Sequence, residues 1–174
     1  MKHTQEEAVE KLNVMLRRTV AEARGRTQKL SQRSFPSSGD IVDIPVESHH
    51  ALGLLLVDMM NGGEEWYAIP VDTFSFIGIA DILVPKCDDQ WQTAIRCGCG
   101  TWINPKLFST ESRFDFVDDC VVLQVRRLLS ELVRGTLAAS DSQLVTEDDE
   151  DYIDHIDAIA KFAEDVQSWV NRSA

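Results

Sequence analysis

The chain has 174 residues, of which 44% are hydrophobic and 26% charged, which is enough for one well-buried core and too few to require two full domains. Its longest apolar run is about seven residues, whereas a membrane-spanning helix needs roughly 20, so we expect no membrane span. Glutamates stand early in the N-terminal segment and no apolar core follows them, so we expect neither a signal peptide nor a transit peptide, and a cytoplasmic protein.

The net charge of −12 is unevenly distributed along the chain. Residues 1–33 hold eight Lys and Arg against four Glu (+4), residues 34–140 hold seven against fifteen acids (−8), and residues 141–174 hold two against ten (−8). Nucleic-acid affinity comes largely from neutralising phosphates, so we do not expect the body and the tail to bind nucleic acid. Only the basic N-terminal arm has the positive charge to attract nucleic acid.

The first expected element is an amphipathic helix over residues 4–23, where apolar residues recur at three-and-four spacing. Gly25 is the expected end of this helix. Residues 35–39 have the Pro, Gly and Ser content of a connector. We therefore expect a helical arm with its connector over residues 1–38.

The following segment is typical of short strands. Apolar, β-branched and aromatic stretches alternate there with turn signals. Asn61-Gly62-Gly63 predicts a hairpin, and the glycines of Cys97-Gly98-Cys99-Gly100 predict a bulge or a tight bend. About five or six strands in one run favour a small barrel or a strongly bent antiparallel sheet. The expected strand segments are residues 40–46, 51–60, 66–71, 74–84 and 92–103.

Two helices are expected after the strands. Residues 115–137 return to helical spacing, with an apolar stripe that we expect to pack on the sheet. Consecutive acids then open a last helix, whose apolar face needs the barrel, the N-terminal helix, a second copy or a partner to cover it. We expect an α+β chain with a helical arm (1–38), a β-barrel with its packed helix (39–138) and a linker with an acidic helix (139–174). The apolar residues of the last helix are Ile153, Ile156, Ala160, Ala163, Val166 and Val170.

Three short motifs follow one another along the β-rich segment. Gly39-Asp40-Ile41-Val42 opens the first strand, His49–Val57 carries the second, and Ile69-Pro70-Val71-Asp72-Thr73 ends the third. This order, followed by further strands and a helix rich in Val, Leu and Arg, resembles the MazF/PemK toxin family over residues 39–136. The resemblance implies an SH3-like barrel and a metal-independent RNA endonuclease. In such enzymes an arginine and a threonine or serine help the RNA 2′-hydroxyl attack the neighbouring phosphate. The corresponding catalytic candidates here are Thr73, His49 and His50.

The chain departs from that family in its basic residues. Histidines stand where the family has a basic segment, and no Arg or Lys occurs between Arg33 and Lys86. Histidine can act as a general acid or base near neutral pH, but it holds a phosphate less well than the bidentate guanidinium of arginine. A ribonuclease site would need Thr73, a histidine and a basic residue such as Arg96 or Arg113 to converge.

The cysteines and histidines are also candidate metal ligands. Cys97 and Cys99 would point to the same side of a strand, yet structural zinc sites usually contain two Cys-x₂₋₄-Cys pairs. The alternative is small residues packing at a bend, with free thiols throughout and no Cys/His signature of a nucleophile. We expect no bound metal and no cofactor. The candidate ligands are His49, His50, Cys87, Cys97, Cys99, Cys120 and His155.

The acidic run at the start of the last helix is the candidate partner-binding element. Such a run is usually a solvated helix start, and the alternative is that it binds a basic partner or imitates nucleic-acid phosphates. We favour a non-catalytic interaction or regulatory module, linked by its resemblance to toxin–antitoxin or defence proteins, that binds a protein partner or a second copy. The alternative is a MazF/PemK-type ribonuclease. The run comprises Glu147, Asp148, Asp149, Glu150 and Asp151.

Overall fold

The computed structural model describes residues 25, 27–48, 51–60, 62–73, 78, 80–84, 93–136 and 150–173. The chain divides into two compact units, Met1–Ser34 and Phe35–Ala174. In the first unit residue 25 and residues 27–32 are helical. The expected helix end at Gly25 is therefore wrong, because a glycine inside a helix costs only about 1 kcal/mol, which its neighbours can offset. The helix expected over residues 4–23 lies outside the described residues.

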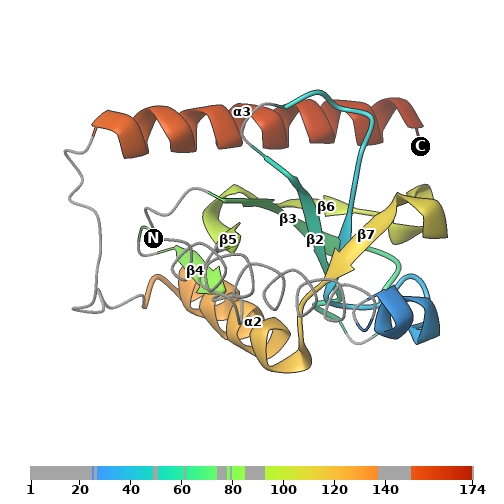
Figure 1. The fold of residues 1–174 in the computed structure, drawn as a ribbon. Helices are drawn as coiled ribbons and strands as arrows, with labels where there is room; N and C mark the ends of the chain where they lie inside the picture. Colours follow the sequence, from blue (N-terminus) through green and yellow to red (C-terminus); the bar gives the residue numbers. More distant parts are fainter. Residues whose placement is uncertain are drawn as a thin grey trace, which may run out of the picture. The chain divides into compact units, whose positions relative to one another are not determined.

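The second unit is an α+β structure in which a curled antiparallel sheet forms a half-barrel between two helices (Figure 1). The strand order is β4-β5-β3-β2-β1-β7, and β6 pairs separately with β3. This confirms the expected fold class. The strands are β1 (Asp40–Val42), β2 (Gly53–Val57), β3 (Trp66–Asp72), β4 (Asp81–Val84), β5 (Thr93–Arg96), β6 (Thr101–Ile103) and β7 (Arg113–Phe116). The helices are η1 (Cys97–Cys99), η2 (Pro105–Leu107), η3 (Thr110–Ser112), α2 (Asp119–Arg134) and α3 (Glu150–Ser173).

The strands β2 and β3 form the hairpin that the glycine-rich turn predicted. They pair in antiparallel register from Gly53 opposite Val71 to Val57 opposite Tyr67. Gly62 in the turn has a φ of +108°, a value that only glycine adopts without strain. The predicted bend at Cys97–Gly100 is also present, as the 3₁₀ turn η1 between β5 and β6.

The edge strand β7 was not expected from the sequence. It pairs with β1, with Phe116 opposite Asp40, so the chain is still extended where we expected the helix to have begun. Asp118 has the extended backbone of an N-cap residue, and α2 starts only at Asp119. Helical spacing alone missed this boundary because pairing with β1 holds the residues of β7 extended.

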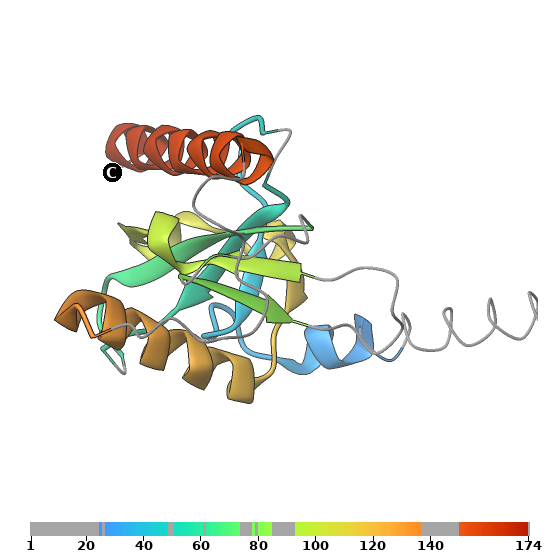
Figure 2. The same cartoon turned by 90° about the vertical axis from the view of Figure 1, so that its left-hand side faces the viewer.

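The two helices lie on opposite faces of the sheet, as Figures 1 and 2 show. Side chains alternate between the faces along each strand, so Leu55 and Val57 join the core under α2, whereas Leu54 and Leu56 join the core under α3. The apolar side of α3 is thus covered by the sheet of its own chain. Ile153 was expected on that side but is 42% exposed. The buried residues of α3 are His155, Ile159, Phe162, Val166 and Val170.

Within the described ranges, no helix combines the length and the apolar character that a membrane span requires.

Candidate functional site

Three charged side chains from neighbouring strands meet in the interior of the second unit. Asp72 ends β3, Asp81 begins β4 and Arg96 ends β5. The strand register brings them together, because Arg96 lies directly opposite Asp81 and two residues beyond Ala94, which is opposite Asp72. Cross-strand and diagonal neighbours of this kind are within reach of a long side chain.

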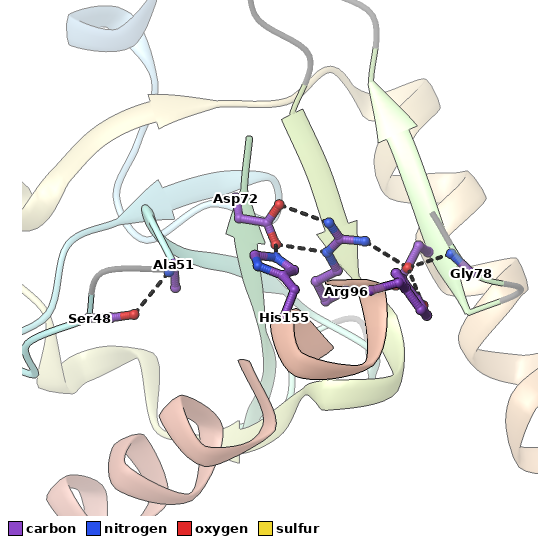
Figure 3. Close-up of polar contacts among 8 residues, drawn as sticks. Ser48, Ala51, Asp72, Gly78, Arg96 and His155 are labelled. Carbon is purple, nitrogen blue, oxygen red and sulfur yellow. Dashed lines mark hydrogen bonds and ion pairs between the residues drawn. The ribbon is translucent and has the colours of Figure 1, made fainter. Parts of the chain in front are cut away.

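The guanidinium of Arg96 is held between the two carboxylates. Figure 3 shows its paired contact with Asp72. Its Nε donates to Asp72 Oδ2 at 2.7 Å and its Nη2 donates to Asp72 Oδ1 at 2.9 Å, which makes the pair bidentate. Its Nη1 donates to Asp81 Oδ2 at 2.8 Å. The Arg96 side chain is 0% exposed. A buried charge is tolerated only when it is paired and hydrogen-bonded, and this geometry meets both conditions.

The first two turns of α3 complete the cluster from above the sheet. The hydroxyl of Tyr152 donates to Asp81 Oδ2 at 2.9 Å, and Nε2 of His155 lies 3.0 Å from Asp72 Oδ2. The backbone N–H of Gly78 also donates to Asp81 Oδ2, at 2.8 Å. The cluster therefore joins three strands to the helix through polar contacts.

The environment of the cluster shifts several pKa values. Burial by itself lowers the pKa of Arg96, but hydrogen bonds and charges from Asp72 and Asp81 outweigh it and raise that pKa, so the guanidinium stays charged. Burial and the negative charge of Asp81 raise the pKa of the Tyr152 phenol. The phenol therefore remains a hydrogen-bond donor at neutral pH.

The thiols of η1 lie beside the same cluster. Burial, followed by the charge of Asp81, raises the pKa of Cys97 to about 12 and that of Cys99 above its usual value. Thiolates are the nucleophilic form of cysteine, so neither thiol is activated. Among the described residues no group of three or more His, Cys, Asp and Glu is arranged to hold a metal ion.

Of the three expected catalytic residues the structure describes Thr73 alone, so their convergence stays a prediction. Thr73 is exposed just after β3, whereas Arg96 is buried and paired with two aspartates. Arg113 is also buried, with its Nη1 3.7 Å from Asp40 Oδ2 and its guanidinium 5.5 Å from the centre of the Phe35 ring. The two histidines of the catalytic prediction, His49 and His50, lie outside the described residues.

The acidic run of the partner-binding prediction is described only in part. Glu150 and Asp151 are exposed in the first turn of α3. Glu147, Asp148 and Asp149 lie outside the described residues. The exposed side of α3 continues this acidic character along the helix, with Asp154, Asp157, Glu164 and Asp165.

Sequence reasoning did not find the Arg96 cluster, although a signal for it was present. Arg96 stands in the apolar segment Ala94–Cys97. Asp72 is the last residue of β3 and directly follows its apolar residues. A charge inside a buried strand requires a partner of opposite charge. His155 carried a second signal, because it occurs at helical spacing with Ile159 and Phe162.

No protein-family model matches the sequence, and no curated protein and no solved structure matches it either.

Proposed function

We propose that this chain is a non-catalytic protein-interaction module, in which a barrel resembling the MazF/PemK type holds an acidic helix on its surface. The observation that carries the proposal is the state of Arg96, whose guanidinium is buried, paired with Asp72 and Asp81, and covered by α3. An arginine in this position stabilises a helix on a sheet. It offers no charge to a phosphate in solution.

The second arginine considered for catalysis supports the same proposal. Arg113 is directed at the fully buried carboxylate of Asp40 and at the Phe35 ring. RNA cleavage requires cationic or proton-transferring groups that reach the substrate, within hydrogen-bond distance of the reacting atoms. Both arginines are instead buried against carboxylates.

The outer face of α3 is the surface best suited to a partner. It carries six exposed acids against two bases, a net charge of −4 over residues 150–173. Complementary charge speeds association and selects the partner, so a protein with a basic surface segment fits this face. Because the apolar side of α3 is already buried on the sheet, the partner is expected to contact the acidic side alone. The acids are Glu150, Asp151, Asp154, Asp157, Glu164 and Asp165.

The test is affinity purification of the tagged protein from its native cells, with nuclease treatment and cross-linking. We expect a protein partner that survives nuclease and cross-links to Lys161, which is exposed on the same helix. A variant with its outer face neutralised (Asp154→Asn, Asp157→Asn, Glu164→Gln, Asp165→Asn) should lose that partner. A matched control neutralises exposed acids elsewhere: Glu47→Gln, Glu64→Gln, Glu65→Gln and Glu111→Gln.

The control variant should keep the partner. Retention of the same partner by the neutralised helix, or recovery of RNA that disappears with nuclease, would contradict the proposal. Point substitutions suit this test better than deletion of α3, because a deletion would expose the apolar core that the helix covers.

One observation supports the alternative that the protein is a ribonuclease. Thr73 is exposed at the end of β3, and the residue before it, Asp72, contacts His155. A hydroxyl next to a histidine–carboxylate pair is a recurring element of hydrolytic sites, although His155 is itself buried. Measurement of RNA cleavage with and without Thr73 separates the two functions.

A further inference from the structure

The sheet carries a separate apolar core on each face, and only one of the two contains α3. The first core joins α2 to the sheet through residues such as Val125 and Leu129, and no described residue of α3 belongs to it. The second core includes Phe162, Val166 and Val170 of α3. The core between the sheet and α2 therefore does not depend on side chains of α3.

The two halves of α3 are held in different ways. Its C-terminal half is held by apolar packing, in which Phe162 and Val166 are buried and the Trp169 ring lies 5.7 Å from that of Phe108. Its N-terminal half is held on the Arg96 cluster by Tyr152 and His155. The C-terminal half also has a polar contact with the sheet, in which the Thr101 hydroxyl donates to the side-chain oxygen of Gln167. The contacts with the buried charges are at the N-terminal end of the helix.

We propose that α3 is a detachable strap, which leaves the sheet as a unit while the core under α2 stays closed. Its latch consists of the Tyr152–Asp81 and His155–Asp72 contacts. The inference concerns how the helix is held and does not rest on the proposed function. Cooperative units of this kind open below the free energy of global unfolding in many proteins.

The polar contacts of the latch can open without leaving a buried carboxylate unpaired, so the cost of opening lies in the apolar surface of the second core. When Tyr152 and His155 leave, Asp72 still accepts two hydrogen bonds from Arg96, and Asp81 still accepts from Arg96 and from the N–H of Gly78. No buried carboxylate is left unpaired, which is the event that makes breaking a buried charge pair expensive. The released phenol and imidazole then form hydrogen bonds with water.

Gly78 offers a way to disturb the latch without changing α3 or Arg96. A Cβ atom at this position would clash with the hydroxyl oxygen of Tyr152 and lie 2.9 Å from its ring carbon, so the Tyr152 ring would have to shift to make room for it. Gly98 is a matched control, since a Cβ there meets only Ala80, at an ordinary 3.4 Å. Gly78→Ala should therefore act on the strap, and Gly98→Ala should not.

The experiment is hydrogen exchange of the full chain followed by mass spectrometry, comparing peptides from α3 (Glu150–Ser173) and α2 (Asp119–Arg134). Loss of one hydrogen bond in Tyr152→Phe should make the α3 amides exchange about tenfold faster, with no change in α2. Gly78→Ala should have the same selective effect. Gly98→Ala should match the wild type.

Two results would overturn the proposal. Equal acceleration of α2 and α3 in Tyr152→Phe would show that the helix opens only with the whole unit. Unchanged α3 exchange in both Tyr152→Phe and Gly78→Ala would show that these contacts are no latch. The double variant Gly78→Ala/Tyr152→Ala provides a further check, because removing the ring relieves the clash and its effect should be less than the sum of the single effects.

Discussion

Asp72 and Arg96 are joined by two parallel hydrogen bonds, of 2.7 Å and 2.9 Å, inside a sheet whose other buried side chains are mostly apolar. The pair is nearly inaccessible to solvent, with 0% exposure for Arg96 and 1% for Asp72. Bidentate geometry and burial together make this the strongest polar contact between β3 and β5. The pair therefore ties the end of β3 to the end of β5 inside the sheet.

Removal of Arg96 is expected to destabilise the protein strongly. Arg96→Ala leaves Asp72 and Asp81 buried without their cation, which should lower the free energy of unfolding by about 3–5 kcal/mol. Urea unfolding followed by circular dichroism measures this change. The control is Arg127→Ala, whose exposed side chain pairs with Glu131 on the helix surface and should contribute at most about 0.5 kcal/mol. Similar effects for the two variants would contradict the structural role of Arg96.

Truncation of the buried face of α3 should also be costly if the helix packs as described. Phe162 is 5% exposed, and Phe162→Ala should lower the free energy of unfolding by about 3–5 kcal/mol. Leu123→Ala on the outer side of α2 serves as the comparison, because Leu123 is 62% exposed and its loss should change stability by about 0.5 kcal/mol or less. A helix that awaited an external partner would instead tolerate Phe162→Ala in the isolated protein.

Much of the fold was predictable from local patterns. The hairpin follows from a glycine-rich turn between two apolar segments, and the bend at η1 follows from glycines in a strand pattern. Both helices also follow from apolar spacing. The edge strand β7 was not predictable in this way, because its four residues are specified by pairing with β1, a partner about 70 residues away.

The cluster was harder to predict than the fold, for a physical reason. Arg96, Asp72 and His155 are individually ordinary, and only strand register and helix docking bring them together. For α3, the sequence did not show which side of the helix packs on the sheet. Its apolar residues fit two neighbouring stripes, and the stripe that contains His155, rather than the one that contains Ile153, faces the sheet.

Stability should decline in alkaline solution. Burial raises the pKa of the phenols of Tyr67 and Tyr152 and of the thiols of Cys97 and Cys99 in the folded protein. The folded state then holds these protons more tightly than the unfolded state does. The associated stability is complete below the ordinary thiol pKa of 9.0 and is lost as the pH rises through the folded values, about 12 for Cys97.

Urea midpoints measured at several pH values above about 8 test this dependence. Tyr152→Phe should show a shallower decline than the wild type, because it removes one of the raised groups. A stability that stays constant between pH 9.0 and about 12 would contradict the burial of these groups.

The thiols should differ widely in reactivity. Cys120 is exposed, whereas Cys97 is buried with its pKa raised to about 12 by burial and by Asp81. In the folded protein near neutral pH, iodoacetamide should modify Cys97 at least about 100-fold more slowly than Cys120. Peptide mass spectrometry over a time course gives both rates, and labelling in urea should remove the difference. Equal rates in the folded protein would place Cys97 outside the core.

Whether the Arg96 cluster is purely structural or part of a catalytic site is tested most directly by incubating the purified protein with single-stranded RNA in EDTA, beside its Thr73→Ala variant. We expect neither protein to cleave the RNA, because the two arginines that the ribonuclease hypothesis requires as candidates, Arg96 and Arg113, are buried against carboxylates. Cleavage by the wild type that is lost in a stably folded Thr73→Ala variant would contradict the non-catalytic proposal and establish the ribonuclease.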